Sequence, residues 1–218
     1  MAFVPWHDHK PLILTALEVW QEEKSSANLL ALTNRIEDAI KTQHVKQKGD
    51  LLIEMNEDGI AYSAMDQADM GIALIESGLA TGNKNWISLG KKSLNVLLTD
   101  VKRGGLRKDS GGTSWFHGQT SRDSKSPGGT LNKHMAATRD LIEASQLLGS
   151  NGKDYYNAGI EGAKQLASDR FPNLKDYFVI QKGKIVRESW LYYSINTTNR
   201  RQYFLKNNEK NPVYHVYE

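Results

Sequence analysis

Apolar residues recur with the spacing of an α-helix along most of the chain up to residue 169. In the stretch 84–99, Trp86, Leu89 and Leu97 share one face, whereas lysines occupy the opposite face. A repeat of about 3.6 residues is typical of amphipathic helices that bury one side. We therefore predict helices over residues 10–24, 26–46, 58–77, 84–99, 131–148 and 153–169.

Short polar breaks separate the two helices of each of the pairs 10–46, 58–99 and 131–169, which indicates antiparallel helical hairpins. A shift of 69 residues places Gly90 on Gly159 and aligns the segment 84–99 with 153–169, so the hairpins look like copies of one unit. Repeated helical hairpins build either an open solenoid or a closed α/α toroid. We predict a mainly α fold, with a helical-repeat domain over residues 1–170 that forms a partial α/α toroid or a short solenoid.

The predicted helix 58–77 differs from the others in composition. It is rich in alanine, glycine, serine and methionine, and it contains neither lysine nor arginine. A helix with small residues and few charges is buried on most sides. We expect it to lie inside the helical domain, with Asp58 as its N-terminal cap.

The pattern changes in two other parts of the chain. Residues 100–128 are rich in glycine, serine and charges, which predicts a long loop with a short strand near 113–116. Residues 176–181 and 184–193 are β-branched and aromatic, separated by Lys182-Gly183, as in a β-hairpin. We therefore predict a second part, residues 171–218, formed by a C-terminal β-hairpin and a tail packed on the helices.

Composition excludes several classes of protein. The chain is 39% hydrophobic and 24% charged, as in a globular domain, and it contains no cysteine for disulfides or thiolate sites. No apolar stretch approaches the ~20 residues of a membrane span, and no signal peptide is visible. The compartment stays open: periplasmic or secreted if a leader precedes this sequence, and cytoplasmic otherwise.

Charge and motifs limit the partners. The net charge of +3 is too small for a nucleic-acid-binding tail, so we expect no nucleic acid partner. We expect no cofactor, because no nucleotide-binding signature is present, and no metal, because His7, Asp8 and His9 alone do not make a closed site. The segment 100–125 is locally basic, which suits either a polyanionic ligand or a solvated loop.

Candidate chemistry lies near the start of the predicted helix 131–148. In the preceding loop, Trp115 suits stacking on a sugar ring, and His117 and Gln119 offer an imidazole and an amide. The alternative is a loop anchored on the core by its aromatic residues. His134 lies in the apolar stripe, one turn from the helix start, with Asn132 at the same end. It is either a core histidine with one hydrogen-bond partner or a group that transfers protons near neutral pH.

The C-terminal part carries a second group of aromatic and basic residues. Tyr193, Arg200 and His215 belong to it, and a tyrosine acts as a general acid or base when cations lower its pKa. Alternation along a strand sends Tyr192 and Tyr193 to opposite faces, so only one of them can face a shared site. The same residues also suit a packed aromatic core.

Several short sequence segments, taken in order, resemble the C-terminal domain of the D-glucuronyl C5-epimerase family. They are residues 65–73, 93–98, 101–107, 129–132 and 214–215. The resemblance spans about residues 58–218 and implies an α/α toroid-type domain that inverts C5 of uronic acids in polysaccharides. The family's acidic-plus-tyrosine phrase is replaced here by residues 116–119, and its later tyrosine phrase is only loosely matched by 192–194.

Together these features predict a protein that acts on an acidic polysaccharide or oligosaccharide by removing the C5 proton of a uronic acid, as an epimerase or a lyase. A cation must neutralise the substrate carboxylate, and a base must take the proton. The candidate cations are Arg103, Arg107 and Arg200. The candidate bases are His117, His134 and Tyr193. The alternative is a non-catalytic helical-repeat module that binds a glycan or a protein partner. The sequence leaves the oligomeric state open.

Overall fold

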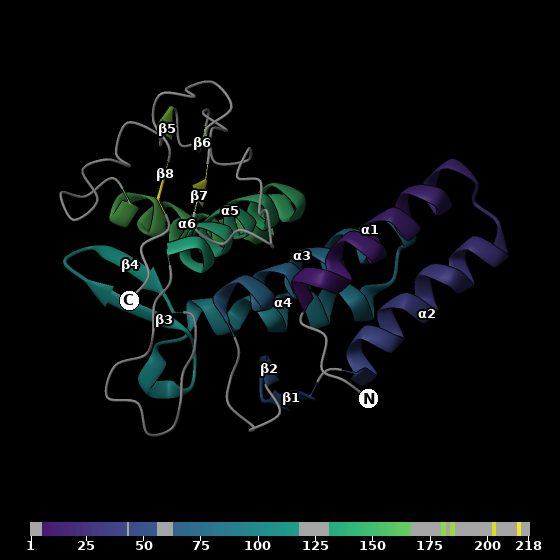
Figure 1. Ribbon diagram of the computed structural model, residues 1–218, viewed down its shortest axis with the longest axis horizontal. Coiled ribbons are helices and arrows are strands. Elements are labelled where there is room, and N and C mark those ends of the chain that lie inside the picture. Colours follow the sequence, from purple (N-terminus) through teal and green to yellow (C-terminus); the bar gives the residue numbers. More distant parts are fainter. Residues whose placement is uncertain are drawn as a thin grey trace.

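The structure is a computed structural model that describes residues 6–42, 44–55, 63–117 and 131–166, and four two-residue strands between 180 and 214. The described part is mainly helical, as predicted, and its helices form antiparallel pairs (Figure 1). The pairs are α1 (Trp6–Glu22) with α2 (Ser26–Thr42), α3 (Ala64–Thr81) with α4 (Lys84–Leu98), and α5 (Leu131–Leu148) with α6 (Lys153–Leu166). None of these helices combines the length and the apolar character that crossing a membrane requires.

Helix α3 lies at the centre of the packing. It contacts α1 on one side and α5 on the other, and it pairs with α4 (Figure 1). Residues 64–75 are all buried, so the prediction that this charge-poor helix lies inside the domain is confirmed. Met70 and Leu74 face the cluster shared with α1 and α2, whereas Ile72 and Ile75 face the cluster shared with α4, α5 and α6.

The two ends of α3 and the start of α1 differ from the predicted ones. Ser63 rather than Asp58 caps α3, and Gly82 ends it in the left-handed conformation with φ 76°. Helix α1 begins at Trp6, four residues before the predicted start, so Pro11 lies inside it. The earlier start is explained by the complete burial of the Trp6 side chain, which packs in the core.

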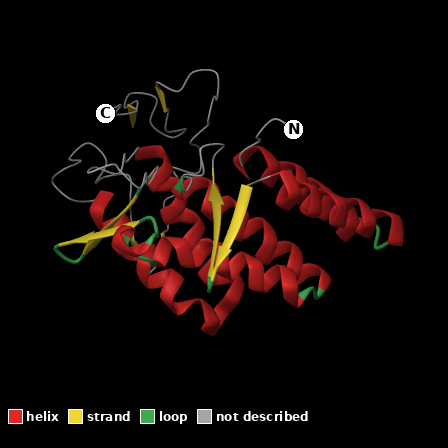
Figure 2. Ribbon diagram, turned by 90° about the horizontal axis from the view of Figure 1, so that it is seen from below, coloured by secondary structure: helices red, strands yellow, loops and turns green. Residues whose placement is uncertain are grey.

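Two short hairpins accompany the helices. Strands β1 (His44–Lys48) and β2 (Leu51–Met55) pair antiparallel and lie across the helices, where β2 contacts α4 (Figure 2). The predicted helix 26–46 therefore ends earlier, because the polar residues after Thr42 pair with a strand whose Leu52 and Ile53 are buried. The second strand has three consecutive apolar residues, 51–53, and therefore shows no alternation that would predict a half-buried strand.

The segment 100–128 is only partly a loop, which corrects the prediction. Residues Val101–Arg103 form a 3-10 turn, and β3 (Arg107–Ser110) pairs with β4 (Thr113–Phe116). Gly111 and Gly112 join these strands with φ of 58° and 79°, the left-handed conformations that a two-residue hairpin turn requires. The predicted strand near 113–116 is confirmed.

Further strands lie in the C-terminal part. The hairpin predicted around Lys182-Gly183 has its innermost residues paired, in β5 (Ile180–Gln181) and β6 (Lys184–Ile185). The strands β7 (Gln202–Tyr203) and β8 (Val213–Tyr214) pair with each other. The other residues after 166 lie outside the described ones, so the boundary at residue 170 stays a prediction.

The aligned glycines of the two helical hairpins lie at equivalent crossings. A Cβ on Gly90 of α4 would lie 2.7 Å from the backbone oxygen of Gly71, and one on Gly159 of α6 would lie 2.6 Å from the side chain of Ile142. Both glycines let an outer helix approach its partner closely. The repeat seen in the sequence therefore reflects the same packing in both hairpins.

We expect Gly90→Val to lower the free energy of unfolding by about 1–3 kcal/mol or more, because the added atoms meet backbone that cannot move aside cheaply. Urea denaturation followed by circular dichroism measures this difference. The matched control is Ser88→Val on the exposed face of the same helix, which we expect to change stability by about 0.5 kcal/mol or less. Equal losses in both variants would contradict the close crossing.

Candidate functional site

The first turn of α3 carries a buried carboxylate that is held from several sides. The Ser63 hydroxyl accepts the backbone N–H of Asp66 at 3.2 Å and donates to Asp66 Oδ2. This is a capping arrangement in which the cap and the third helical residue bind each other. The Asp66 side chain is only 1% exposed, so its negative charge needs partners inside the protein.

One of those partners is His7, at the start of α1. Its Nδ1 lies 2.8 Å from Asp66 Oδ1, and its backbone N–H donates to the same oxygen at 3.2 Å. Because a carboxylate only accepts, Nδ1 is the donor. The hydrogen bond to Asp66 raises the pKa of His7, burial opposes this, and the charges of Asp66, Asp8 and Asp69 add to the rise. The other ring nitrogen, Nε2, lies 3.6 Å from Asp8 Oδ1.

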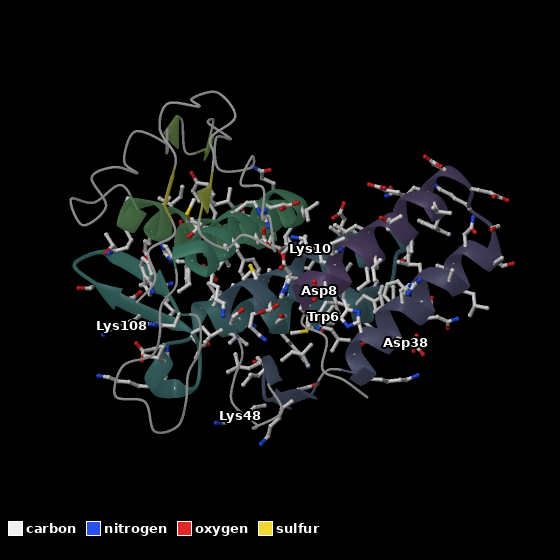
Figure 3. All side chains as sticks on the ribbon, viewed as in Figure 1. Trp6, Asp8, Lys10, Asp38, Lys48 and Lys108 are labelled. Carbon is white, nitrogen blue, oxygen red and sulfur yellow. The ribbon has the colours of Figure 1, made fainter. Side chains whose placement is uncertain are left out.

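One helical turn further along α1, Lys10 binds two carboxylates on two helices. Its Nζ lies 2.9 Å from Asp69 Oδ1 on α3 and 3.1 Å from Asp140 Oδ2 on α5. Arg139 Nε donates to the other oxygen of Asp140. Lys10 therefore lies where α1 meets α3 and α5 (Figure 3), and only 15% of its side chain is exposed. Two cationic side chains, Lys10 and Arg139, thus face two buried carboxyl groups in this network.

The charges of this network shift one another's pKa values. Burial alone would lower the pKa of Lys10, but the nearby carboxylates outweigh it and raise that pKa. Burial also raises the pKa of Asp69, and Asp140 adds to the rise, although Lys10 opposes it. For Asp140, burial is outweighed by Lys10 and Arg139, which hold its pKa well below the usual range. The network thus keeps at least one buried carboxylate charged.

His134 is fully buried and joins three elements. Its Nδ1 accepts the backbone N–H of Phe116 at 3.1 Å, so Nε2 carries the proton and donates to the carbonyl of Gly162 at 3.2 Å. The ring also stacks on Trp115, with centroids 4.2 Å apart. Burial lowers the pKa of His134 to about 3, the Gly162 carbonyl opposes this, and His117 adds to the fall. This geometry fits a core histidine, with two backbone partners where the sequence suggested one.

His117 follows β4 and lies against the start of α3. Its backbone N–H donates to the carbonyl of Leu106 at 2.8 Å, and its carbonyl accepts the N–H of Ala64 at 3.0 Å. The side chain is buried. The first turn of α3 therefore binds the backbone of His117 through Ala64 and the ring of His7 through Asp66.

The two described arginine candidates differ in their surroundings. Arg107 on β3 is held by two carboxylates, with Nε 2.6 Å from Asp109 and a terminal nitrogen 2.6 Å from Glu161 on α6. The Ser114 hydroxyl lies 2.8 Å from Asp109 and 3.0 Å from Glu161 and shares its single proton between these carboxylates. Arg103, at the end of the 3-10 turn, is exposed. Arg107 thus anchors the β3–β4 hairpin on α6, whereas Arg103 faces solvent.

The remaining candidate residues contribute less to this geometry. Trp115 is half-buried on β4, and Asn132 lies in the first turn of α5. The candidates Gln119, Tyr193, Arg200 and His215 lie outside the described residues. Among residues that the structure describes, no group of His, Cys, Asp or Glu side chains is arranged to hold a metal ion.

Sequence reasoning missed His7, Lys10 and the carboxylates that they bind. Their pairing joins residues 59 positions apart, which no local pattern encodes. One signal was present, however. The predicted helix 58–77 holds Asp66 and Asp69 but no cation, so buried acids there required cations from another element.

The fold and these residues define a mainly helical domain with buried polar side chains in the first turns of α3. Comparison with known families identifies it: the family described as D-glucuronyl C5-epimerase C-terminus matches residues 50–216. The match covers most of the chain, so the chain belongs to this family and the resemblance seen in the sequence is confirmed. Membership associates the chain with the processing of uronic-acid-containing polysaccharides. No curated protein and no solved structure matches the chain significantly.

We expect Lys10→Met to lower the free energy of unfolding by about 3–5 kcal/mol at neutral pH, because it removes the closest cation of the buried Asp69 and leaves Asp140 with Arg139 alone. The loss should shrink in acid, where Asp69 and Asp140 take up protons. Urea denaturation at several pH values measures both effects. The matched control, Lys41→Met, removes an exposed pair with Glu37 and should cost about 0–1 kcal/mol. A loss as small as that of the control would contradict the buried network.

The pair of His7 and Asp66 makes stability depend on pH. Because the folded-state pKa of His7 is raised above 6.5, its stabilising contribution is complete below that pH and is lost as pH rises through the folded-state value. His7→Asn keeps a donor for Asp66 but removes the charge. We therefore expect wild type to exceed His7→Asn in unfolding free energy at about pH 5.5 and the gap to narrow by about pH 9. A gap that does not change with pH would rule the charged pair out.

Proposed function

We propose that this chain acts on uronic-acid-containing polysaccharides by removing the proton from C5 of a uronic acid. The observation that carries the proposal is the family match over residues 50–216. That segment includes α3 to α6 and the β3–β4 hairpin, and with them Asp66 and His117, whereas His7 and Lys10 on α1 precede it. Epimerisation and β-elimination share this first step.

The helical layers support an arc of an α/α toroid. Helices α1, α3 and α5 contact one another in that order, whereas α2 and α4 each pair with one of these helices. The pairs His7–Asp66 and Lys10–Asp69 have the same separation in sequence, as expected where two helices run parallel. Parallel inner helices bring their N-terminal ends to one side. We propose that the substrate binds on that side.

The surroundings of the candidate bases favour His117. Both ring nitrogens of His134 are hydrogen-bonded to backbone, and burial lowers its pKa to about 3, so it is a weak base. His134 then acts by fixing β4, the strand that carries Trp115 and directly precedes His117. Tyr193 stays a candidate for a second acid or base. This assignment makes His117 the group that takes the C5 proton.

The other candidates bind the substrate in this proposal. The electron pair left at C5 spreads into the uronate carboxylate, where a cation must stabilise it. Arg103 suits this role better than Arg107, because Arg103 is exposed and Arg107 is already bound to two carboxylates. Trp115 suits stacking on a sugar ring. The further candidates for binding the glycan are Gln119, Asn132, Arg200 and His215.

The ion pairs of Arg107 favour one alternative, a module that binds a glycan or a protein partner without chemistry. A cation held by Glu161 and Asp109 has little charge left for a substrate. If the chain is such a module, we expect a variant with both His117→Ala and His134→Ala to bind glycan as wild type does. The activity experiment below separates the two functions.

We expect wild-type protein to incorporate deuterium at C5 when a panel of uronate polysaccharides is incubated with it in heavy water. Nuclear magnetic resonance detects the deuterium, and ultraviolet absorbance detects unsaturated uronates if elimination follows. On substrates of the C5 configuration from which His117 takes the proton, His117→Gln should lower the rate by about 100-fold or more, and Arg103→Met should lower it as well. The control Lys84→Met, exposed at the start of α4, should stay within about 2-fold.

A folded wild-type protein that gives neither deuterium incorporation nor absorbance on the whole panel would contradict the enzymatic proposal. Glycan binding measured on the same panel would then favour the binding module.

A further inference from the structure

A change of configuration at C5 places two demands on a site. One group removes the proton from one face of the sugar, and a proton must return on the other face. Two acid–base groups on opposite sides of the carbon meet both demands directly. With His117 proposed as one of them, the second must lie near the same first turn of α3.

His7 lies at that turn. Its backbone N–H and its Nδ1 both bind Oδ1 of Asp66, while the Ser63 hydroxyl donates to Oδ2. This fixes the plane of the imidazole and commits Nδ1 to the buried carboxylate. Nε2 is therefore the ring position that gains and loses a proton. The side chain is 29% exposed, whereas Asp66 is buried, so the ring has a buried and an open side.

A purely structural role for this pair is already filled nearby. Lys10, one turn along α1, ties the same helix to α3 and α5 through two ion pairs. Docking of α1 thus does not rest on the imidazole at position 7 alone. The pairing of a half-exposed imidazole with a buried carboxylate is the arrangement by which proteins orient histidines that transfer protons.

We propose that His7 is the second acid–base group of this site and returns the proton to C5 on the face opposite His117. The inference rests on the proposed function. The C5–H bond breaks as His117 takes the proton, and the electron pair spreads into the substrate carboxylate. The Nε2–H bond of His7 then breaks as the new C5–H bond forms. Solvent afterwards reprotonates His7 and removes the proton from His117.

The charges around His7 suit a proton donor. Asp66 and Asp69 on α3 and Asp8 on α1 all favour the imidazolium, and the pKa of His7 is raised accordingly. The ring therefore holds its proton to higher pH than an isolated histidine. Asp66 also stabilises the positive charge until the proton is transferred. Residue 7 precedes the family-matched segment, so α1 contributes this group from outside it.

The experiment follows exchange and inversion separately, for uronate polysaccharides of both C5 configurations in heavy water. His7→Asn keeps the donor to Asp66 but lacks Nε2. With one configuration as substrate, it should lose inversion by about 100-fold or more while exchange at C5 without inversion continues. His117→Gln should also lose inversion, but it should exchange the C5 proton only in substrates of the other C5 configuration. Lys84→Met should retain both activities, and circular dichroism checks that every variant is folded.

A pH profile provides a readout that a structural role would not move. Inversion should fall at high pH as His7 loses its proton. In Asp66→Asn this alkaline limb should shift to lower pH, because the carboxylate no longer raises the pKa of His7. Two results would overturn the role of His7 and leave the proposed function standing. One is an inversion rate of His7→Asn within about 2-fold of wild type, and the other is an alkaline limb that lies at the same pH in Asp66→Asn as in wild type. Absence of both exchange and unsaturated uronates in wild type would instead overturn the proposed function and this inference together. Unsaturated uronates formed without any inversion would overturn this inference and leave the proposed function standing.

Discussion

The ion pairs of Lys10 with Asp69 and Asp140 are the interaction on which the rest of the arrangement depends. Burying two carboxylates is costly unless a cation compensates them, and Arg139 reaches mainly one of the two. The second cation comes from α1, which precedes the segment matched by the family. Helix α1 is therefore part of the charge balance of the domain core rather than an appendage to it.

The same docking fixes the register of α1 on α3. Lys10 meets Asp69, and His7 meets Asp66, with one helical turn between the pairs on each helix. Slippage by a single residue would turn both cations away from their carboxylates, because each residue rotates a helix by about 100°. The buried ion pairs of Lys10 thus position the imidazole of His7 at the start of α1. Stability and the proposed chemistry share one interface.

The sequence predicts what depends on local pattern and misses what depends on distant partners. The bounds of α5 and of β4 agree with the predicted ones, because a clear helical period and a glycine turn define them. The sequence indicated that Arg107 is a cation available to a substrate. In the structure, Glu161, which lies 54 residues further along the chain, neutralises it. The second partner of His134 is likewise a carbonyl of α6. Such pairings follow from how the helical hairpins stack, which the periodicity of each helix does not determine.

Native-state hydrogen exchange tests most directly whether α1 and α3 form one unit. The ion pairs predict that amides in the middle of α1, around Ile13, open with nearly the same free energy as those of α3, around Ile72, since both side chains are fully buried. Both sets should then exchange only through global unfolding. Exchange of the α1 amides by a separate opening, several kcal/mol less costly than that of α3, would contradict the account.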